Sequence, residues 1–194
     1  MCRKKKTTMH KLSMEELHRL SKDQYGEVAK LPVVIVLDNI RSLSNVGAVF
    51  RSADAFRIGE VLLCGITACP PQREIHKTAL GAEETVKWRY FASTVEACCE
   101  LKSMGYRIFA VEQVEGSVML QDFKMEPNMA FIMGNEVEGV SDEALQFCDA
   151  AIEIPQEGTK HSLNVSVCSG IIMWNIFNQI VLNRGKNAMV DGFC

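Results

Sequence analysis

The chain has 194 residues, of which 47% are hydrophobic and 23% are charged. This length corresponds to one domain with a short appendage, and the composition disfavours a disordered chain, a collagen-like repeat and a coiled coil. The net charge is −3, but residues 1–30 carry eight Lys or Arg residues and four acids, so this segment sums to +4 and the remainder to −7. Such a basic arm can touch phosphates, or it can merely keep a terminus soluble.

The N-terminus and the cysteines indicate the compartment. The chain begins Met-Cys-Arg-Lys-Lys-Lys without the apolar stretch of a signal peptide, and no apolar run approaches the ~20 residues that span a bilayer. We therefore expect a cytoplasmic protein with no membrane partner. The eight cysteines form no CxxC pair and no Cys/His ligand spacing. We expect them to be small buried hydrophobes in a reducing compartment, with no metal site.

The predicted elements alternate along the chain after an N-terminal segment, residues 10–30, that is typical of one amphipathic helix with a break near Gly26. Apolar runs predict strands at 31–38, 60–64, 85–92, 106–112, 130–134 and 150–155. Helical patterns fall at 44–57, 74–81, 93–104, 141–148 and 162–182. This alternation predicts an α/β fold with a mostly parallel sheet flanked by helices. We expect a basic extension over 1–30, one domain over 31–182 and a tail over 183–194.

In such sheets ligands bind beyond the carboxyl ends of the strands, so the loops there are the candidate sites. After the first strand, Ser44 or Asn45 can cap a helix in which Arg51 follows Gly47 by one turn. Helical side chains lean toward the N-terminus, which would place the guanidinium over the bare Gly47 backbone and near Asn45. That position suits an anion such as a phosphodiester. The alternative is a surface ion pair between Arg51 and Asp54.

A second loop follows the strand that ends at Met133. Gly134 and Gly139 permit close backbone approach and positive φ, and Ser141 can cap the next helix. The loop is not a P-loop, and GxGxxG occurs nowhere in the chain. Its two acids, Glu136 and Glu138, would repel a pyrophosphate, so a cationic or zwitterionic ligand is favoured. The alternative is a tight glycine turn without a ligand.

A third loop runs from Ile154 into the last long helix. Ser162 is a plausible N-cap, which would put Asn164 in the first turn beside unpaired N–H groups. His161 is a lone histidine, and we interpret it as a loop residue or cap in preference to a base or metal ligand.

Together, the three segments in this order resemble the SpoU/TrmH family of SPOUT methyltransferases, which methylate the ribose 2′-hydroxyl of tRNA or rRNA. Residues 45–56, 134–140 and 162–166, the last preceded by Ile154-Pro155, look like the family's three motifs. The resemblance covers 32–182 and implies a SPOUT-type α/β knot with a deep C-terminal trefoil knot, which pattern rules alone do not predict. Arg57 departs from the family, which usually has glycine there, and Cys168 and Ser169 stand where alanines are frequent.

The resemblance implies a homodimer that binds S-adenosylmethionine in the knot. The cofactor-binding positions that it carries over are Met133, Gly134, Ile154, Ser162, Leu163 and, more weakly, Glu112. A backbone-built pocket needs glycine and apolar side chains, and a positively charged sulfonium tolerates an acidic loop.

The same resemblance gives a catalytic set of Arg51, Asn45, Glu136, Ser162 and Asn164. A guanidinium with a pKa above ~12 is a poor general base, so we expect Arg51 to hold the substrate phosphate and to lower the pKa of the 2′-hydroxyl. Asn45 would orient Arg51 or the ribose. Ser162 and Asn164 would shape the pocket, and Glu136 would orient its loop or contact the ligand.

The expected partner is RNA, either tRNA or rRNA, and not DNA. Three alternatives remain. One is an RNA-binding protein that keeps the fold without catalysis, and another is a SPOUT methyltransferase acting on a base nitrogen. The third, a nucleotide-dependent oxidoreductase with an ordinary Rossmann sheet, is disfavoured by the missing GxGxxG.

Overall fold

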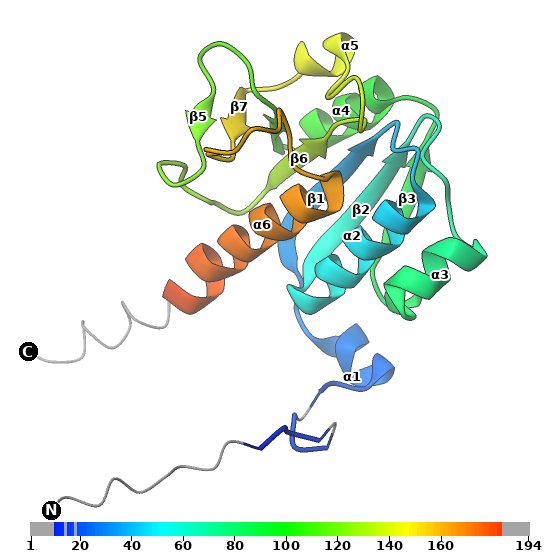
Figure 1. Ribbon diagram of the computed structural model, residues 1–194. Helices are drawn as coiled ribbons and strands as arrows, with labels where there is room; N and C mark the ends of the chain where they lie inside the picture. The colour runs from blue at the N-terminus through cyan, green and yellow to red at the C-terminus, as the bar shows by residue number, and fades with distance from the viewer. Residues whose placement is uncertain (1–9, 14, 18, 184–194) are drawn as a thin grey trace, which may run out of the picture.

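The computed structural model describes residues 10–13, 15–17 and 19–183, and shows a twisted sheet between two layers of helices (Figure 1). All seven strands pair in parallel, in the spatial order β3-β2-β1-β6-β4-β7-β5. Their bounds are β1 Leu31–Asp38, β2 Ile58–Cys64, β3 Trp88–Phe91, β4 Arg107–Val111, β5 Val118–Met119, β6 Met129–Met133 and β7 Ala150–Glu153. The α/β class and the parallel sheet expected from the sequence are confirmed.

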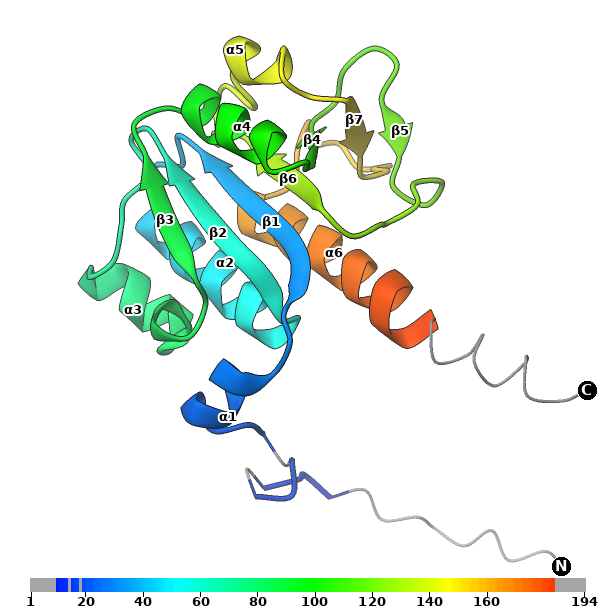
Figure 2. The ribbon, with the colours of Figure 1, turned by 180° about the vertical axis from the view of Figure 1, so that it is seen from behind.

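The helices are α1 Lys22–Glu27, α2 Leu43–Ala55, α3 Arg73–Ala79, α4 Thr94–Ser103, α5 Asp142–Leu145 and α6 Val165–Phe177. A 3₁₀ turn, η1 Ala82–Glu84, follows α3, and a π-helical segment, η2 Asn178–Leu182, continues α6. Helices α2, α3 and α6 cover one face of the sheet and α4 the other, as the opposite view shows (Figure 2).

Strand β1 explains why the two layers form. It lies at the centre, where Ile35 pairs with Val61 of β2 and with Phe131 of β6. Successive strand residues point to opposite faces, so Ile35 packs in the core beneath α2 and α6, and Val36 packs in the core beneath α4. A strand buried on both faces needs the continuous apolar run that the sequence shows.

The helix predicted over residues 10–30 is much shorter in the structure. Of the described residues within 10–30, only those of α1 are helical. Ser21 begins this helix with a capping box, because its hydroxyl accepts from the Gln24 N–H and the Gln24 side chain accepts from the Ser21 N–H. The helix ends at Glu27, one residue after the expected break at Gly26. The basic residues Arg3–Lys6 and the tail over 184–194 lie outside the described residues.

Other boundaries shift for local reasons. Strand β3 begins at Trp88 instead of residue 85, because Thr85 still donates its N–H to Ala82 at the end of η1. The helix expected over 141–148 is the single turn α5. Strand β5 was not predicted at all, since two residues show no periodicity. The trefoil knot and the three-part division of the chain stay predictions.

Helix α6 and η2 together form the most apolar helical stretch. Val165–Leu182 has a mean hydropathy of 1.6 over 18 residues, which is long and apolar enough to cross a bilayer by length and composition. The expectation that no run approaches this length was therefore too strict. A core helix passes the same test, and Ile172, Met173 and Ile176 are buried in this core. We therefore draw no conclusion about a membrane from this helix, and the cytoplasmic location stays a prediction.

Six cysteines lie in the described part of the chain, and all six are free thiols. Burial raises the pKa of Cys64 and of Cys98 to about 12, so these thiols stay protonated and unreactive. Cys69, Cys148 and Cys168 are partly buried. Cys64, Cys69, Cys98, Cys148 and Cys168 are therefore buried or partly buried, as expected of small hydrophobic residues. Cys99 is exposed.

Candidate active site

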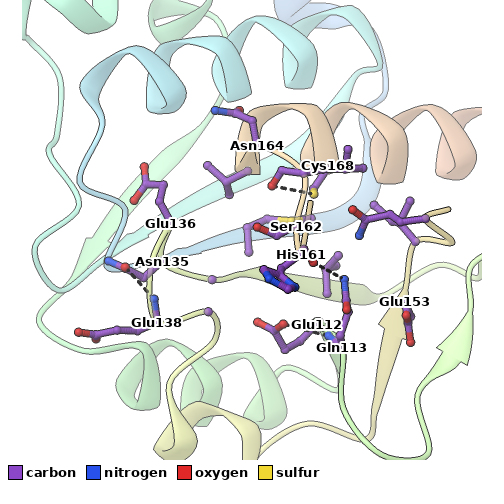
Figure 3. A pocket seen from close by; sticks show the side chains of 18 of the residues that line it. Glu112, Gln113, Asn135, Glu136, Glu138, Glu153, His161, Ser162, Asn164 and Cys168 are labelled. Carbon is purple, nitrogen blue, oxygen red and sulfur yellow. Dashed lines mark hydrogen bonds between the residues drawn. The ribbon is translucent and has the colours of Figure 1, made fainter. Parts of the chain in front are cut away.

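A cavity of about 550 Å³ lies at the carboxyl ends of β4, β6 and β7 (Figure 3). Its wall is formed by residues 111–113, 133–139, 152–154 and 161–165, together with Gln156 and Cys168. The three strands are neighbours in the sheet, so loops far apart in the sequence converge there. The volume falls within the range of about 300–1,000 Å³ that is typical of small-molecule sites.

Every residue expected to bind the cofactor lines this one cavity. These residues are Glu112, Met133, Gly134, Ile154, Ser162 and Leu163. The placement agrees with the expected site, and the binding role of each residue stays a prediction.

The glycine loop after β6 folds back so tightly that its backbone forms a wall of the cavity. Asn135 and Gly139 exchange two backbone hydrogen bonds of 2.8 and 3.0 Å, and Gly139 has a φ of +72°. A Cβ atom on Gly134 would lie 2.2 Å from both the Gly139 carbonyl carbon and the Val140 nitrogen. Glu112 accepts the Val140 N–H at 3.0 Å, which fastens the loop to the end of β4. The loop is therefore both a tight glycine turn and a cavity wall.

Asn135 is a structural residue that the sequence did not single out. Its side-chain amide donates to the Asn39 carbonyl at 2.6 Å, and its side-chain oxygen accepts from the Val137 and Glu138 N–H groups. The second loop is thereby held against the first loop. An asparagine next to a loop glycine is the signal that could have found it, because Asn side chains often bond to nearby backbone groups.

Glu136 binds the start of α2. Its carboxylate accepts from the Arg41 N–H at 3.1 Å, from the Ser42 N–H at 3.2 Å and from the Asn45 side-chain amide at 2.9 Å. Burial by itself raises the pKa of Glu136, but the hydrogen bonds from Arg41, Asn45 and Ser42 outweigh it and lower the pKa below its ordinary value. Glu136 is thus held as an anion that orients the first loop.

Asn164 extends this network to the third loop. Its side-chain amide donates to the Asn45 side-chain oxygen at 3.2 Å, while its own side-chain oxygen accepts from the Ser166 N–H at 2.9 Å. Three of the five residues expected to be catalytic, one from each motif, therefore form a single chain of hydrogen bonds: Glu136, Asn45 and Asn164.

The same contacts correct both predicted helix caps. Asn164, not Ser162, caps α6, so this helix begins three residues later than expected and leaves Ser162 in the cavity wall. Ser42, not Ser44 or Asn45, caps α2, because its hydroxyl accepts the Asn45 N–H at 3.3 Å. Each cap is decided by which side chain the neighbouring loops turn toward the helix end, and spacing does not reveal that.

Arg51 does not lie where the sequence placed it. The space over Gly47 is taken by α3, since a Cβ atom there would be 2.0 Å from the Thr78 hydroxyl oxygen. Arg51 instead lines a shallow hollow on the outer face of α2 with residues such as Tyr25 of α1. The alternative also fails, because Arg51 forms no ion pair or hydrogen bond with any other residue that the structure describes, Asp54 included.

Two other expectations concern single residues. Arg57 has a φ of +53°, in the left-handed region that favours glycine, which accounts for the glycine usual in the family at this position.

His161 lies in the loop as expected and lines the cavity, and its main-chain carbonyl accepts from the Gln113 side-chain amide at 3.0 Å. The sequence had not singled out Gln113.

A parallel sheet whose carboxyl-end loops enclose a cavity defines an α/β ligand-binding protein. The model of the SpoU rRNA Methylase family matches residues 32–174, and the chain belongs to this family. It is 30% identical to the 23S rRNA (guanosine-2'-O-)-methyltransferase RlmB of Neisseria meningitidis serogroup B, over 84% of this chain and 65% of that protein. The chain thus spans just under two thirds of that relative's length.

Solved structures give the same family. The TrmH/SpoU tRNA modifying enzyme of A. aeolicus superposes with a TM-score of 0.73 at 25% identity, covering 85% of this chain and 81% of that one. The AdoMet-bound rRNA methyltransferase from Sinorhizobium meliloti superposes with a TM-score of 0.72 at 25% identity, covering 84% and 62%.

Proposed function

We propose that the protein is an S-adenosylmethionine-dependent methyltransferase that acts on a ribose 2′-hydroxyl of tRNA or rRNA. The observation that carries this proposal is the hydrogen-bonded chain Glu136–Asn45–Asn164, which joins all three motifs at the edge of one cavity. The name of the Neisseria relative, a guanosine-2'-O-methyltransferase, and the AdoMet-bound state of the Sinorhizobium structure support it.

The cavity wall fits the cofactor. Gly134 lets its loop fold back tightly into a cavity wall, and Met133, Ile154 and Leu163 offer apolar surface for an adenine ring. The wall also carries four carboxylates, Glu112, Glu136, Glu138 and Glu153, and no Lys or Arg among the described residues. This charge favours a sulfonium and disfavours the pyrophosphate of a dinucleotide. When bound, the cofactor supplies an electrophilic methyl group.

Arg51 would hold the substrate. Its guanidinium is exposed, and binding a phosphate breaks no ion pair with a residue that the structure describes. A bound guanidinium next to the reacting nucleotide lowers the pKa of the 2′-hydroxyl but does not take its proton, because a guanidinium carries only donors and offers no acceptor. Only RNA carries this hydroxyl, which makes RNA the substrate class.

We expect Asn45, Glu136 and Asn164 to orient groups in the site and not to react themselves. Glu136 and Asn164 fix both ends of the Asn45 amide, so this side chain is oriented before the substrate arrives. Ser162 lies in the cavity wall and offers a hydroxyl to a bound ligand.

A homodimer would complete the site, since Arg51 does not line the cavity of its own chain. Helix α6 offers an apolar face for a second copy. Trp174 is 49% exposed, and its ring lies 5.9 Å from that of Phe56 and 6.3 Å from that of Phe177. Aromatic groups of this kind are enriched at protein interfaces. Trp174→Glu is expected to give monomers in size-exclusion chromatography with light scattering.

Methyl transfer from labelled S-adenosylmethionine to tRNA and rRNA tests the proposed activity. Arg51→Ala should abolish transfer and leave cofactor affinity within a few fold, whereas Arg107→Ala, at the opposite end of the strands, should leave both unchanged. Transfer that survives in Arg51→Ala would contradict the role of Arg51. Nucleoside analysis distinguishes a ribose product from a methylated base, and RNA binding without transfer would identify a non-catalytic protein.

A further inference from the structure

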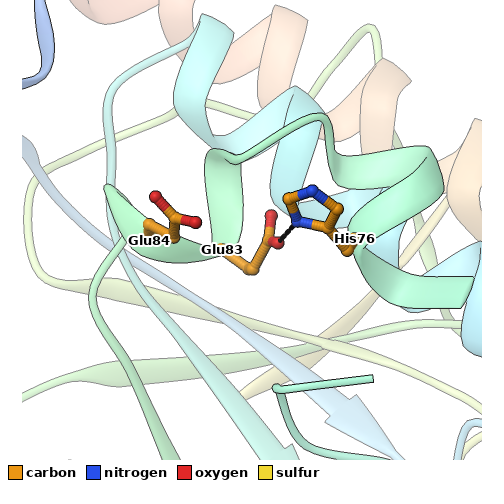
Figure 4. A group of neighbouring side chains, drawn as sticks. All are labelled: His76, Glu83 and Glu84. Atoms are coloured by element: carbon orange, nitrogen blue, oxygen red, sulfur yellow. Dashed lines mark hydrogen bonds and ion pairs between the residues drawn. The ribbon is translucent and has the colours of Figure 1, made fainter. Parts of the chain in front are cut away.

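We propose that His76, Glu83 and Glu84 form a binding site for one Zn²⁺ ion, in a second cavity away from the one described above. His76 lies on α3, and the two glutamates lie on η1 (Figure 4). Between them the chain reverses at Leu80 and Gly81, whose φ angles are +55° and +90°. This reversal brings the imidazole over Glu83, although seven positions separate the two residues.

The three side chains are close enough to share an ion. One ligand atom from each lies within 4.8 Å of the others, and His76 Nδ1 is 2.5 Å from Glu83 Oε1. Zn²⁺ binds nitrogen and oxygen at about 2.0–2.2 Å, which places ligand atoms about 3.4 Å apart in a tetrahedral set. Glu84 is exposed, so a side-chain rotation can bring its oxygen closer by up to about 1.4 Å, while His76 Nδ1 and Glu83 Oε1 must separate by about 0.9 Å to admit the ion.

Glu83 supplies an independent indication of a ligand. Its side chain is only 8% exposed, and its Oε2 atom is the one buried side-chain oxygen or nitrogen in the described chain without a hydrogen-bond partner. A buried carboxylate oxygen without a partner costs free energy that a bound ion or water recovers. Figure 4 shows Glu83 between Glu84 and His76, with its carboxylate turned to the imidazole.

The surroundings identify a competitor for the ion. Lys22 of α1 forms an ion pair with Glu84, and Arg73 lines the same cavity. An arriving cation must displace the Lys22 ammonium from Glu84, because a carboxylate cannot pair fully with both. Removing the Lys22 charge is therefore expected to tighten metal binding, whereas removing a ligand weakens it.

The donor set selects the type of ion. An imidazole with two carboxylates suits Zn²⁺ and similar transition metals, and Mg²⁺ prefers all-oxygen octahedral sites. The bound ion would join α3 to η1. Since α3 packs on Gly47 of α2, this clip would stabilise the layer that carries the first motif.

Isothermal titration of the reduced full-length protein with Zn²⁺, and separately with Mg²⁺, tests the site. We expect one Zn²⁺ per chain and no saturable Mg²⁺ binding. His76→Ala and Glu84→Gln should each weaken Zn²⁺ binding by at least about tenfold. Lys22→Ala should tighten it. His10→Ala, which removes another exposed histidine beside an acid, should have no effect.

Co²⁺ absorption separates this site from the cysteines, because a histidine and carboxylate set gives no thiolate charge-transfer band. Absence of saturable Zn²⁺ binding, equal binding by His76→Ala, or a thiolate band would each overturn the proposal. Both variants should still unfold cooperatively without metal, which verifies that they fold, although His76→Ala removes the hydrogen bond to Glu83 and Glu84→Gln weakens the pairing with Lys22.

Discussion

The cavity wall and the outer face of α2 differ in how their polar groups are held. In the wall, Glu136 accepts three hydrogen bonds, and Glu112 and Asn135 each fasten one loop to another. On the outer face, Arg51 has no described partner, and just beyond the end of α2 Arg57 adopts a left-handed conformation that favours glycine. The cavity is thus organised before any ligand binds, whereas the exposed Arg51 side chain is not fixed by any described residue.

This difference fits the two kinds of ligand in the proposed reaction. A small cofactor is recognised by a preorganised pocket, and an RNA phosphate is recognised by an accessible cation. We therefore expect the wall to be rigid and the outer face to be unconstrained.

Gly134→Ala should have the largest effect, because its Cβ atom would meet the backbone of Gly139 and Val140 at 2.2 Å. We expect a loss of about 3 kcal/mol in the free energy of unfolding and at least tenfold weaker cofactor binding. Urea unfolding and titration calorimetry measure both. Gly158→Ala is the matched control, since nothing lies within 4 Å of its Cβ position. Normal stability of the Gly134→Ala variant would show that the wall is not rigid.

Glu136→Gln should cost about 1 kcal/mol of stability, because a glutamine presents one acceptor where the carboxylate serves three donors. Combined with Asn45→Ala in a double-mutant cycle, it should show a coupling energy of about 0.5–1 kcal/mol. Glu138→Gln is the control, because its described ion pair with Arg41 spans 3.9 Å. Additive effects of the Glu136 and Asn45 changes would mean that the network does not act as a unit.

The same carboxylate should give a pH-dependent signal. The pKa of Glu136 is lower in the folded chain than its ordinary value of 4.5, so its contribution to stability is fully present above pH 4.5 and is lost as the pH falls through the folded value. The stability difference between the unmodified protein and Glu136→Gln should therefore be constant from pH 7 to about 5 and shrink at lower pH. A difference that stays constant down to about pH 3 would contradict the lowered pKa.

Arg57→Gly should have the smallest effect, a gain of about 0.5–1 kcal/mol, because glycine adopts a φ of +53° without strain. Arg57→Ala is the control, since it removes the charge but keeps the strained conformation, and it should give no gain. Thermal unfolding compares the two. Equal stability of both variants would show that the backbone at position 57 is not strained.

Local patterns were sufficient for the class of fold and for most of the cavity. The apolar run of β1 is buried on both faces, as its composition predicted, and the glycine at 134 is needed for a close backbone approach. The six residues that the family resemblance placed at the cofactor site also line one cavity. The buried strand and the glycine turn depend on side-chain periodicity and on backbone sterics, which act over a few residues and can therefore be predicted from the sequence.

Tertiary structure decided the rest. Spacing could not show that Asn164 caps α6, that α3 covers Gly47, or that Arg51 lines a separate hollow and not the cavity. Nor could it show that β6 lies between β1 and β4, which is what brings Glu112 to the loop at Gly139. Each of these outcomes depends on contacts between segments that are distant in the sequence, and such contacts leave no local period in the chain.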